Sequence, residues 1–207
     1  YLKRINKLYD SSICLVTSPK ENLIETVSSA LKAGVGMIQY RSKNQKDIEK
    51  LNQAIKVASI CKEYDALFIV NDRIDIAIAA QADGVHLGQD DLPYKIARKL
   101  IGNEMIIGRS THSKEQIALA DKEGHDYLGV GPINFSLTKS NINPLGINFI
   151  QETENLTKLP WFAIGGINKE NLPEIKSSGA KRIAVIGAIM NSVDPLKATE
   201  ELIKALK

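Results

Sequence analysis

The chain has 207 residues, of which 43% are hydrophobic, 25% charged and 5% aromatic, as is ordinary for a globular protein. The 27 basic and 24 acidic residues leave a net charge of +3, and no basic run is interleaved with aromatic residues, so we expect no nucleic-acid partner. No apolar stretch has the length of a membrane span or a signal peptide, so we expect a cytoplasmic protein without membrane contact.

Eight short runs rich in β-branched and other apolar residues are the predicted strands. They lie at residues 13–17, 36–41, 67–71, 84–87, 105–109, 127–131, 161–165 and 182–187. Between them, apolar residues recur at spacings of three and four, which predicts helices that alternate with the strands. This alternation indicates a parallel sheet. No linker rich in Pro, Ser or Gly divides the chain, so we predict a single domain over residues 1–207 and leave its oligomeric state open.

One segment interrupts the alternation. Residues 131–146, GPINFSLTKSNINPLG, have neither strand nor helix periodicity. Loops of this length in a compact domain are usually functional or disordered. Because this loop follows the sixth predicted strand and contains Ser136, Thr138 and Lys139, we predict that it is a lid over a binding site. An idle, disordered loop is the alternative.

Polar residues follow six of the predicted strands at the point where each strand ends. The segments are QYRSK at 39–43, VND at 70–72, HLGQDD at 86–91, GRSTH at 108–112, SLTK at 136–139 and IGGI at 164–167. Ligand-type residues at successive strand-to-helix junctions are typical of a barrel whose strand ends surround one site. We therefore predict an α/β fold, a single (β/α)₈ TIM barrel, with its site at that end.

The first of these segments has the composition of an anion site. Gln39, Arg41 and Lys43 alternate, so in an extended chain their side chains share a face. An amide, a guanidinium and an ammonium group suit a multiply charged anion such as a diphosphate. A solvated strand edge of alternating polarity is the alternative. Ser110 could add a hydroxyl for the same anion, unless it only caps the next helix.

Two carboxylates follow neighbouring predicted strands. Asp72 ends VND and Asp91 ends HLGQDD, and neither segment offers the His and Cys spacing of a zinc site. Carboxylates without softer ligands suit Mg²⁺, which takes one or two of them together with substrate phosphate oxygens. Asp72 could instead cap a helix, and Asp90 could replace Asp91 as the ligand.

The remaining candidates are glycines, histidines and cysteines. Gly165-Gly166 and Ile186-Gly187 follow the seventh and eighth strands, where barrels often bind phosphate through backbone N–H groups. We expect His86 to be a hydrogen-bonded residue of the core or near the site, His112 to orient loop backbone, and His125 to be exposed in a turn. Cys14 and Cys61 are expected to be buried apolar residues. No Ser/His/Asp set or cysteine nucleophile is evident.

As a set, the motifs resemble one family. QYRSK, VND, ADGVHLGQDDLP, GRSTH, GPxxxSxTK, AIGGI and VIGAI occur in the order found in the thiamine phosphate synthase family, over residues 13–195. The resemblance implies a (β/α)₈ barrel that uses Mg²⁺ and two small-molecule substrates. The family joins 4-amino-5-hydroxymethyl-2-methylpyrimidine diphosphate to 4-methyl-5-(2-phosphoethyl)thiazole and releases diphosphate.

The resemblance also implies roles for individual residues. The pyrimidine diphosphate would be bound by Gln39, Tyr40, Arg41, Ser42, Lys43, Asn71, Ser110 and Lys139. The thiazole phosphate would be bound by Ser136, Leu137, Thr138, Gly166, Ile186 and Gly187. Asp72 and Asp91 would hold Mg²⁺, and the catalytic residues would be Arg41, Lys43, Ser110 and Lys139. The family usually has Thr at position 136 and commonly Ser at position 187, where this chain has Ser136 and Gly187. We expect these two differences to affect the affinity for the thiazole phosphate.

Three other functions fit parts of the sequence. A generic phosphosugar isomerase fits the glycines after the seventh and eighth strands but leaves QYRSK and Asp72 unexplained. A thiazole tautomerase is built on the same barrel, but it resembles this chain less well, because it has an acid/base His at the position of Pro132 and lacks the carboxylate at Asp72. A non-catalytic phosphate-binding barrel would need neither both carboxylates nor a lysine in the loop. We therefore favour the synthase.

Overall fold

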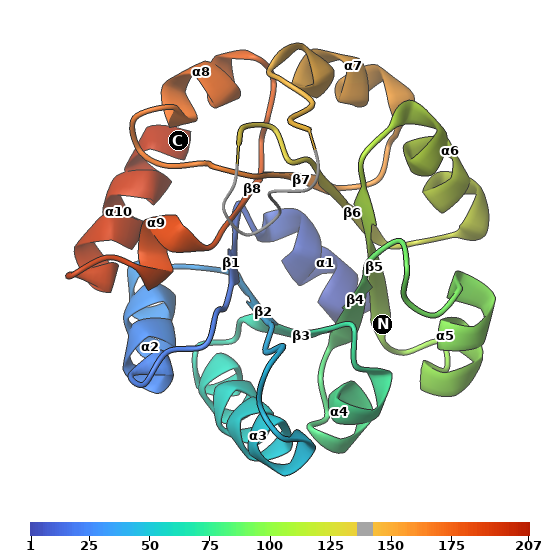
Figure 1. The fold of residues 1–207 in the computed structure, drawn as a ribbon, viewed down its shortest axis with the longest axis vertical. Coiled ribbons are helices and arrows are strands. Elements are labelled where there is room, and N and C mark those ends of the chain that lie inside the picture. Colours follow the sequence, from blue (N-terminus) through green and yellow to red (C-terminus); the bar gives the residue numbers. More distant parts are fainter. Residues whose placement is uncertain (136–142) are drawn as a thin grey trace.

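The computed structural model describes residues 1–135 and 143–207. Its eight strands are parallel and are hydrogen-bonded in chain order, and the last pairs with the first to close a barrel. The helices surround the barrel (Figure 1). The predicted (β/α)₈ fold is confirmed. The predicted lid includes Ser136, Leu137, Thr138 and Lys139, which lie outside the described residues, so the lid stays a prediction.

Every predicted strand overlaps an observed one, and their ends differ by no more than two residues. The strands are β1 (Ile13–Val16), β2 (Met37–Tyr40), β3 (Leu67–Asn71), β4 (Gly84–Leu87), β5 (Ile106–Thr111), β6 (Tyr127–Val130), β7 (Trp161–Ile164) and β8 (Ile183–Val185). The helices are α1 (Leu2–Asp10), α2 (Leu23–Ala33), α3 (Asp47–Glu63), α4 (Ile74–Ala79), α5 (Tyr94–Ile101), α6 (Lys114–Glu123), α7 (Asn148–Leu156), α8 (Leu172–Ser177), α9 (Gly187–Met190) and α10 (Pro195–Leu206).

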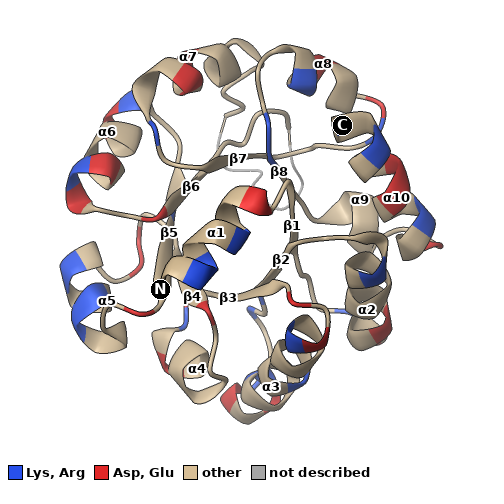
Figure 2. Ribbon diagram, turned by 180° about the vertical axis from the view of Figure 1, so that it is seen from behind, with Lys and Arg blue, Asp and Glu red and all other residues tan. Residues whose placement is uncertain are grey.

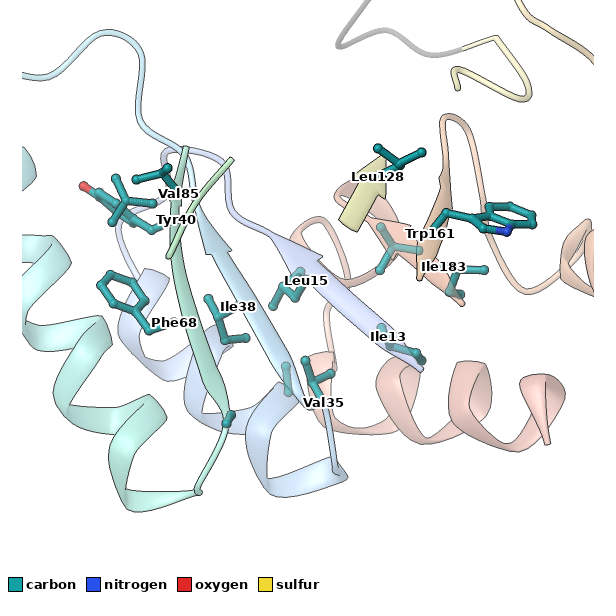
Figure 3. Packing of buried hydrophobic residues seen from close by; sticks show 14 of the residues in the cluster. Ile13, Leu15, Val35, Ile38, Tyr40, Phe68, Val85, Leu128, Trp161 and Ile183 are labelled. Atoms are coloured by element: carbon teal, nitrogen blue, oxygen red, sulfur yellow. The ribbon is translucent and has the colours of Figure 1, made fainter. Parts of the chain in front are cut away.

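The strands are apolar throughout because both of their faces are buried. In β1, Ile13 and Leu15 belong to the layer between barrel and helices, whereas Cys14 and Val16 point into the barrel. Figure 3 shows part of the outer layer, with Leu15 beside Ile38 of β2, its register partner. Cys14 and Cys61 are both free and buried, as predicted. No helix among the described residues is long and apolar enough to cross a membrane.

Helix α1 closes one end of the barrel. It lies across the barrel opening (Figure 2), and Leu8 is fully buried among the interior residues. Ion pairs from Arg4 to Asp83 (2.8 Å) and from Lys7 to Asp65 (2.6 Å) attach it to the chain that leads into β4 and β3. We did not predict this helix, although Leu2, Ile5 and Leu8 have helical spacing. Because α1 covers the amino ends of the strands, the ligand site must lie at their carboxyl ends.

The expectation that His125 is exposed is wrong. It follows Gly124, the left-handed residue that ends α6, and only 2% of His125 remains exposed. Its Nδ1 lies 3.2 Å from the carbonyl oxygen of Ala120, and its ring packs on Tyr94 with a centroid distance of 4.7 Å. Its Nε2 is buried with no hydrogen-bond partner among the described residues. Burial lowers the pKa of His125, although the nearby charge of Glu123 opposes this.

We therefore expect the free energy of unfolding to depend on His125 in mildly acidic solution. Its pKa is 6.5 when unperturbed and lower in the folded protein. At a pH below the unperturbed pKa, the unfolded state therefore binds a proton at His125 more readily than the folded state does. The free energy of unfolding falls as the pH drops. Urea titrations between about pH 5 and pH 8 should show this fall in the parent and a weaker one in His125→Phe. Equal pH dependence in the two proteins would contradict the assignment.

Candidate active site

A cavity lies at the carboxyl ends of the strands, opposite α1. Its polar wall includes Gln39 of β2, Arg41 directly after β2, Asn71 of β3 and Ser110 of β5. Its apolar wall consists of residues from β1, β7 and β8 and the adjoining segments, among them Val16, Phe162, Ile164 and Ile186. The cavity can therefore hold a ligand that combines a polar or charged group with an apolar ring.

One of the predicted cations, Arg41, lies on the polar side of this cavity. Gln39 and Arg41 both line it, as their alternation predicted, and the backbone N–H of Arg41 donates to Thr17 Oγ1 at 2.9 Å. Lys43 is exposed and does not line the cavity. Burial raises the pKa of Asp72, and the charges of Lys43 and Arg41 partly oppose this rise.

Tyr40 and Ser42 have structural contacts instead. The Tyr40 side chain lies in the outer layer, and its hydroxyl donates to Gln53 Oε1 at 2.9 Å. The Ser42 hydroxyl donates to Gln45 Oε1 at 2.6 Å. Both side chains stabilise the connection from β2 to α3. Their predicted contacts with the diphosphate would have to involve the backbone or a rearranged Ser42 side chain, and they stay predictions.

The structure brings Asp72 and Asp91 together. Burial, followed by a hydrogen bond and charge repulsion from Asp91, raises the pKa of Asp72 to about 6. Asp91 Oδ2 also accepts a hydrogen bond of 2.6 Å from Gly88 N. The alternative role of Asp72 as a helix cap is wrong, because Arg73 occupies the N-cap of α4. Asp72 itself has a left-handed backbone, with φ at 64°.

No larger group of metal ligands accompanies this pair. The described residues contain no cluster of three or more His, Cys, Asp and Glu side chains that could hold a metal ion. Asp90, the alternative to Asp91, is exposed. A cation at Asp72 and Asp91 would therefore need further oxygens from water or substrate, which is the arrangement that Mg²⁺ favours.

Ser110 lies inside β5 and does not cap a helix. Ser113 caps α6, and its hydroxyl accepts a hydrogen bond from Gln116 N at 3.3 Å. The hydroxyl of Ser110 lies 2.9 Å from Nε2 of His86, while its carbonyl accepts from Gln89 Nε2 at 2.5 Å. Ser110 therefore has a fixed position on the cavity wall, with both its backbone and its side chain held.

The two histidines of the cavity behave as predicted. His86 is 5% exposed and uses both ring nitrogens in hydrogen bonds, to Ser110 and to the hydroxyl of Tyr127. His112 contacts the carbonyl oxygen of Gly131 through Nδ1. This contact ties the end of β5 to the end of β6, where the predicted lid begins. The sequence did not single out Tyr127.

The residues predicted for the thiazole phosphate are only partly described. Gly166 has φ at 60°, and a Cβ there would overlap the carbonyl oxygen of Phe135. Ile186 lines the cavity, and Gly187 begins α9 directly after it. Ile133 N donates to Ile164 O at 2.8 Å, so the chain after β6 runs beside the end of β7. Ser136, Leu137 and Thr138, like Lys139, fall outside the described residues.

The fold and this cavity define a (β/α)₈ barrel with Arg41 and Ser110 in a cavity at the carboxyl ends of its strands, the end at which such barrels carry their active sites. The family model described as thiamine monophosphate synthase matches residues 13–189. The chain belongs to this family.

Individual relatives agree with the family match. The chain is 52% identical to a thiamine-phosphate synthase of Prochlorococcus marinus (strain MIT 9313) and 46% identical to one of Synechocystis sp. (strain ATCC 27184 / PCC 6803 / Kazusa), with 99% of the chain aligned in each case. It spans about 60% of the length of these curated relatives. A solved thiamine phosphate pyrophosphorylase from Pyrococcus furiosus superposes with a TM-score of 0.88 and 36% identity, covering 100% of this chain and 98% of that one.

Proposed function

We propose that the protein is a thiamine phosphate synthase. It would join 4-amino-5-hydroxymethyl-2-methylpyrimidine diphosphate to 4-methyl-5-(2-phosphoethyl)thiazole, with release of diphosphate. Membership of the family is the first support. The observation that carries the proposal is the cavity itself, which is lined by Arg41, Ser110 and Asn71, the residue directly before Asp72.

Mg²⁺ fits this pair. Burial and the nearby Asp91 both raise the pKa of Asp72, and a divalent cation would offset the repulsion between the two carboxylates. We therefore propose Asp72 and Asp91 as its ligands. When bound, Mg²⁺ would neutralise charge on the diphosphate and so make it a better leaving group.

The side chains of the cavity would bind and orient the substrates. Arg41 and Lys43 would neutralise further charge on the diphosphate, and Ser110 would donate a hydrogen bond to it. The amino-substituted pyrimidine can delocalise positive charge when the bond to the diphosphate breaks, so the reaction needs little acid/base machinery. The apolar wall of Phe162, Ile164 and Ile186 would keep water from the cationic ring and place the thiazole nitrogen for attack.

A direct assay tests this proposal. Purified protein, both substrates and Mg²⁺ should yield thiamine phosphate, detected by mass, together with an equal amount of diphosphate. Reactions that lack the thiazole or contain excess chelator are the controls. The proposal fails if product is absent while both substrates bind. A shifted proton on the thiazole alone would indicate the tautomerase instead.

A further inference from the structure

Three polar side chains of the cavity wall, Tyr127, His86 and Ser110, form a hydrogen-bonded row, and a fourth, Gln39, adjoins it. The Tyr127 hydroxyl lies 3.0 Å from Nδ1 of His86, and Nε2 of His86 lies 2.9 Å from the Ser110 hydroxyl. At the other end, the Gln39 side chain is near enough to Tyr127 to lower the pKa of its phenol. With Gln39, the row runs from β2 through β6 and β4 to β5, and all four residues line the cavity.

The barrel interior is shaped to admit these rings. A Cβ at Gly108 would overlap the Tyr127 ring, and one at Gly129 would lie 3.3 Å from Cε1 of His86. Tyr127 is 2% exposed and meets Phe162 edge to face at 5.9 Å. A phenol hydroxyl in such an interior requires a hydrogen-bond partner. Phenylalanine would fill the same space without that cost, so the hydroxyl calls for an explanation beyond packing.

The explanation lies in the direction of the hydrogen bonds. A neutral imidazole donates from one nitrogen and accepts at the other. If Tyr127 donates to Nδ1 of His86, then Nε2 carries the proton and donates to Ser110, whose own proton is free to point into the cavity. If the order is reversed, Ser110 must donate to His86 and can only accept from a ligand. An anion requires the first arrangement.

We propose that His86 and Tyr127 are positioning residues that hold Ser110 as a hydrogen-bond donor for the diphosphate. His86 is the Nε2–H tautomer, Tyr127 donates to its Nδ1, and Gln39 donates its amide N–H to the Tyr127 oxygen. The carbonyl oxygen of Gln39 is then left to accept from a ligand. This inference deepens the proposed function and rests on it only for the identity of the anion.

The electrostatics of Tyr127 agree with this direction. Burial raises the pKa of Tyr127 well above its ordinary value, so the phenol keeps its proton and can donate it. The Gln39 side chain lowers the same pKa. An N–H group of Gln39 that donates to the phenol oxygen would have this effect, because such a bond stabilises the phenolate.

Nitrogen NMR of the whole protein labelled with ¹⁵N-histidine tests the tautomer without any need for turnover. The signals of His86 are assigned by their loss in His86→Gln. We expect protonated Nε2 and unprotonated Nδ1, with and without inorganic diphosphate and Mg²⁺. The Nδ1–H tautomer, or an imidazolium at neutral pH, would overturn the proposal.

Calorimetry with inorganic diphosphate and Mg²⁺ tests the consequence for binding. Tyr127→Phe removes one oxygen and should weaken diphosphate binding about tenfold, the effect expected for one misdirected hydrogen bond to a charged group. His86→Gln can still present an N–H to Ser110 and should bind better than His86→Leu. Tyr94→Phe, which removes a hydroxyl outside the cavity, is the matched control and should bind like the parent.

The outcomes separate this inference from the proposed function. Equal diphosphate affinity in the parent, Tyr127→Phe and both His86 variants would overturn the positioning role. A parent that makes no thiamine phosphate, but shows the Nε2–H tautomer and the expected order of affinities, would reject the synthase and support the hydrogen-bonded row. In an active parent, Tyr127→Phe should mainly raise the KM for the pyrimidine diphosphate.

Discussion

Asp72→Asn is expected to reduce kcat by about a thousandfold or more, since losing a metal ligand removes several kcal/mol of charge stabilisation from the transition state. Asparagine is the appropriate replacement because it tolerates the left-handed backbone at this position, where φ is 64°. The fold should survive, because the change also removes the repulsion with Asp91 that raises the pKa of Asp72. Turnover at increasing Mg²⁺, together with the melting temperature without metal, measures both effects.

Asp91→Asn and Asp90→Asn complete this test. Asp91→Asn should resemble Asp72→Asn in turnover, although it also weakens the hydrogen bond from Gly88. Asp90→Asn, an exposed neighbour in the same segment, should retain the activity of the parent. If Asp72→Asn keeps full activity, or if the parent is active in excess chelator, the metal assignment is wrong. Loss of activity in Asp90→Asn alone would move the ligand from Asp91 to Asp90.

Arg41→Ala is expected to weaken binding of the pyrimidine diphosphate by about tenfold to a hundredfold, as is typical when a hydrogen-bonded charge is removed. Lys43→Ala should act in the same direction but less strongly, because Lys43 is exposed and water screens its charge. Binding of the thiazole phosphate should hardly change in either variant. Calorimetry with each substrate separately measures the difference.

Lys46→Ala is the matched control for these two variants. Lys46 is exposed on the same connection between β2 and α3 and loses the same charge, but unlike Arg41 it does not line the cavity, and unlike Lys43 it is not part of the predicted QYRSK segment. It should bind both substrates like the parent. Weaker thiazole phosphate binding in Arg41→Ala, with unchanged diphosphate binding, would reverse the assignment of the two halves of the cavity.

The barrel could be predicted because its signals are local and repeated. GVHL became β4 without a change of boundary, and the polar residues after six of the strands marked which end of the barrel carries the site. Helix α1 was missed because Leu2, Ile5 and Leu8 span only a short segment, and its packing against the barrel interior is a tertiary contact. Sequence spacing does not show such a contact.

The sequence predicted which residue types form the site but not the contacts between their side chains. Asp72 and Asp91 could be named from their places after neighbouring strands, whereas their mutual contact appears only in the folded protein. Tyr127 could not be recognised as a site residue from the sequence, because an aromatic residue at the start of a strand is usually part of the core. Its role depends on Gly108 of β5, the neighbouring strand, which leaves room for its ring. His125 was misjudged because its turn looked polar, although the chain turns inward after Gly124.

Crystals grown with Mn²⁺ in place of Mg²⁺ and soaked with diphosphate offer the most direct test of the central claim, that this cavity binds and releases diphosphate. The anomalous signal of Mn²⁺ should appear between the carboxylates of Asp72 and Asp91, with diphosphate density extending towards Arg41 and the Ser110 hydroxyl. Manganese and diphosphate bound together elsewhere on the protein, with this cavity empty, would contradict the account.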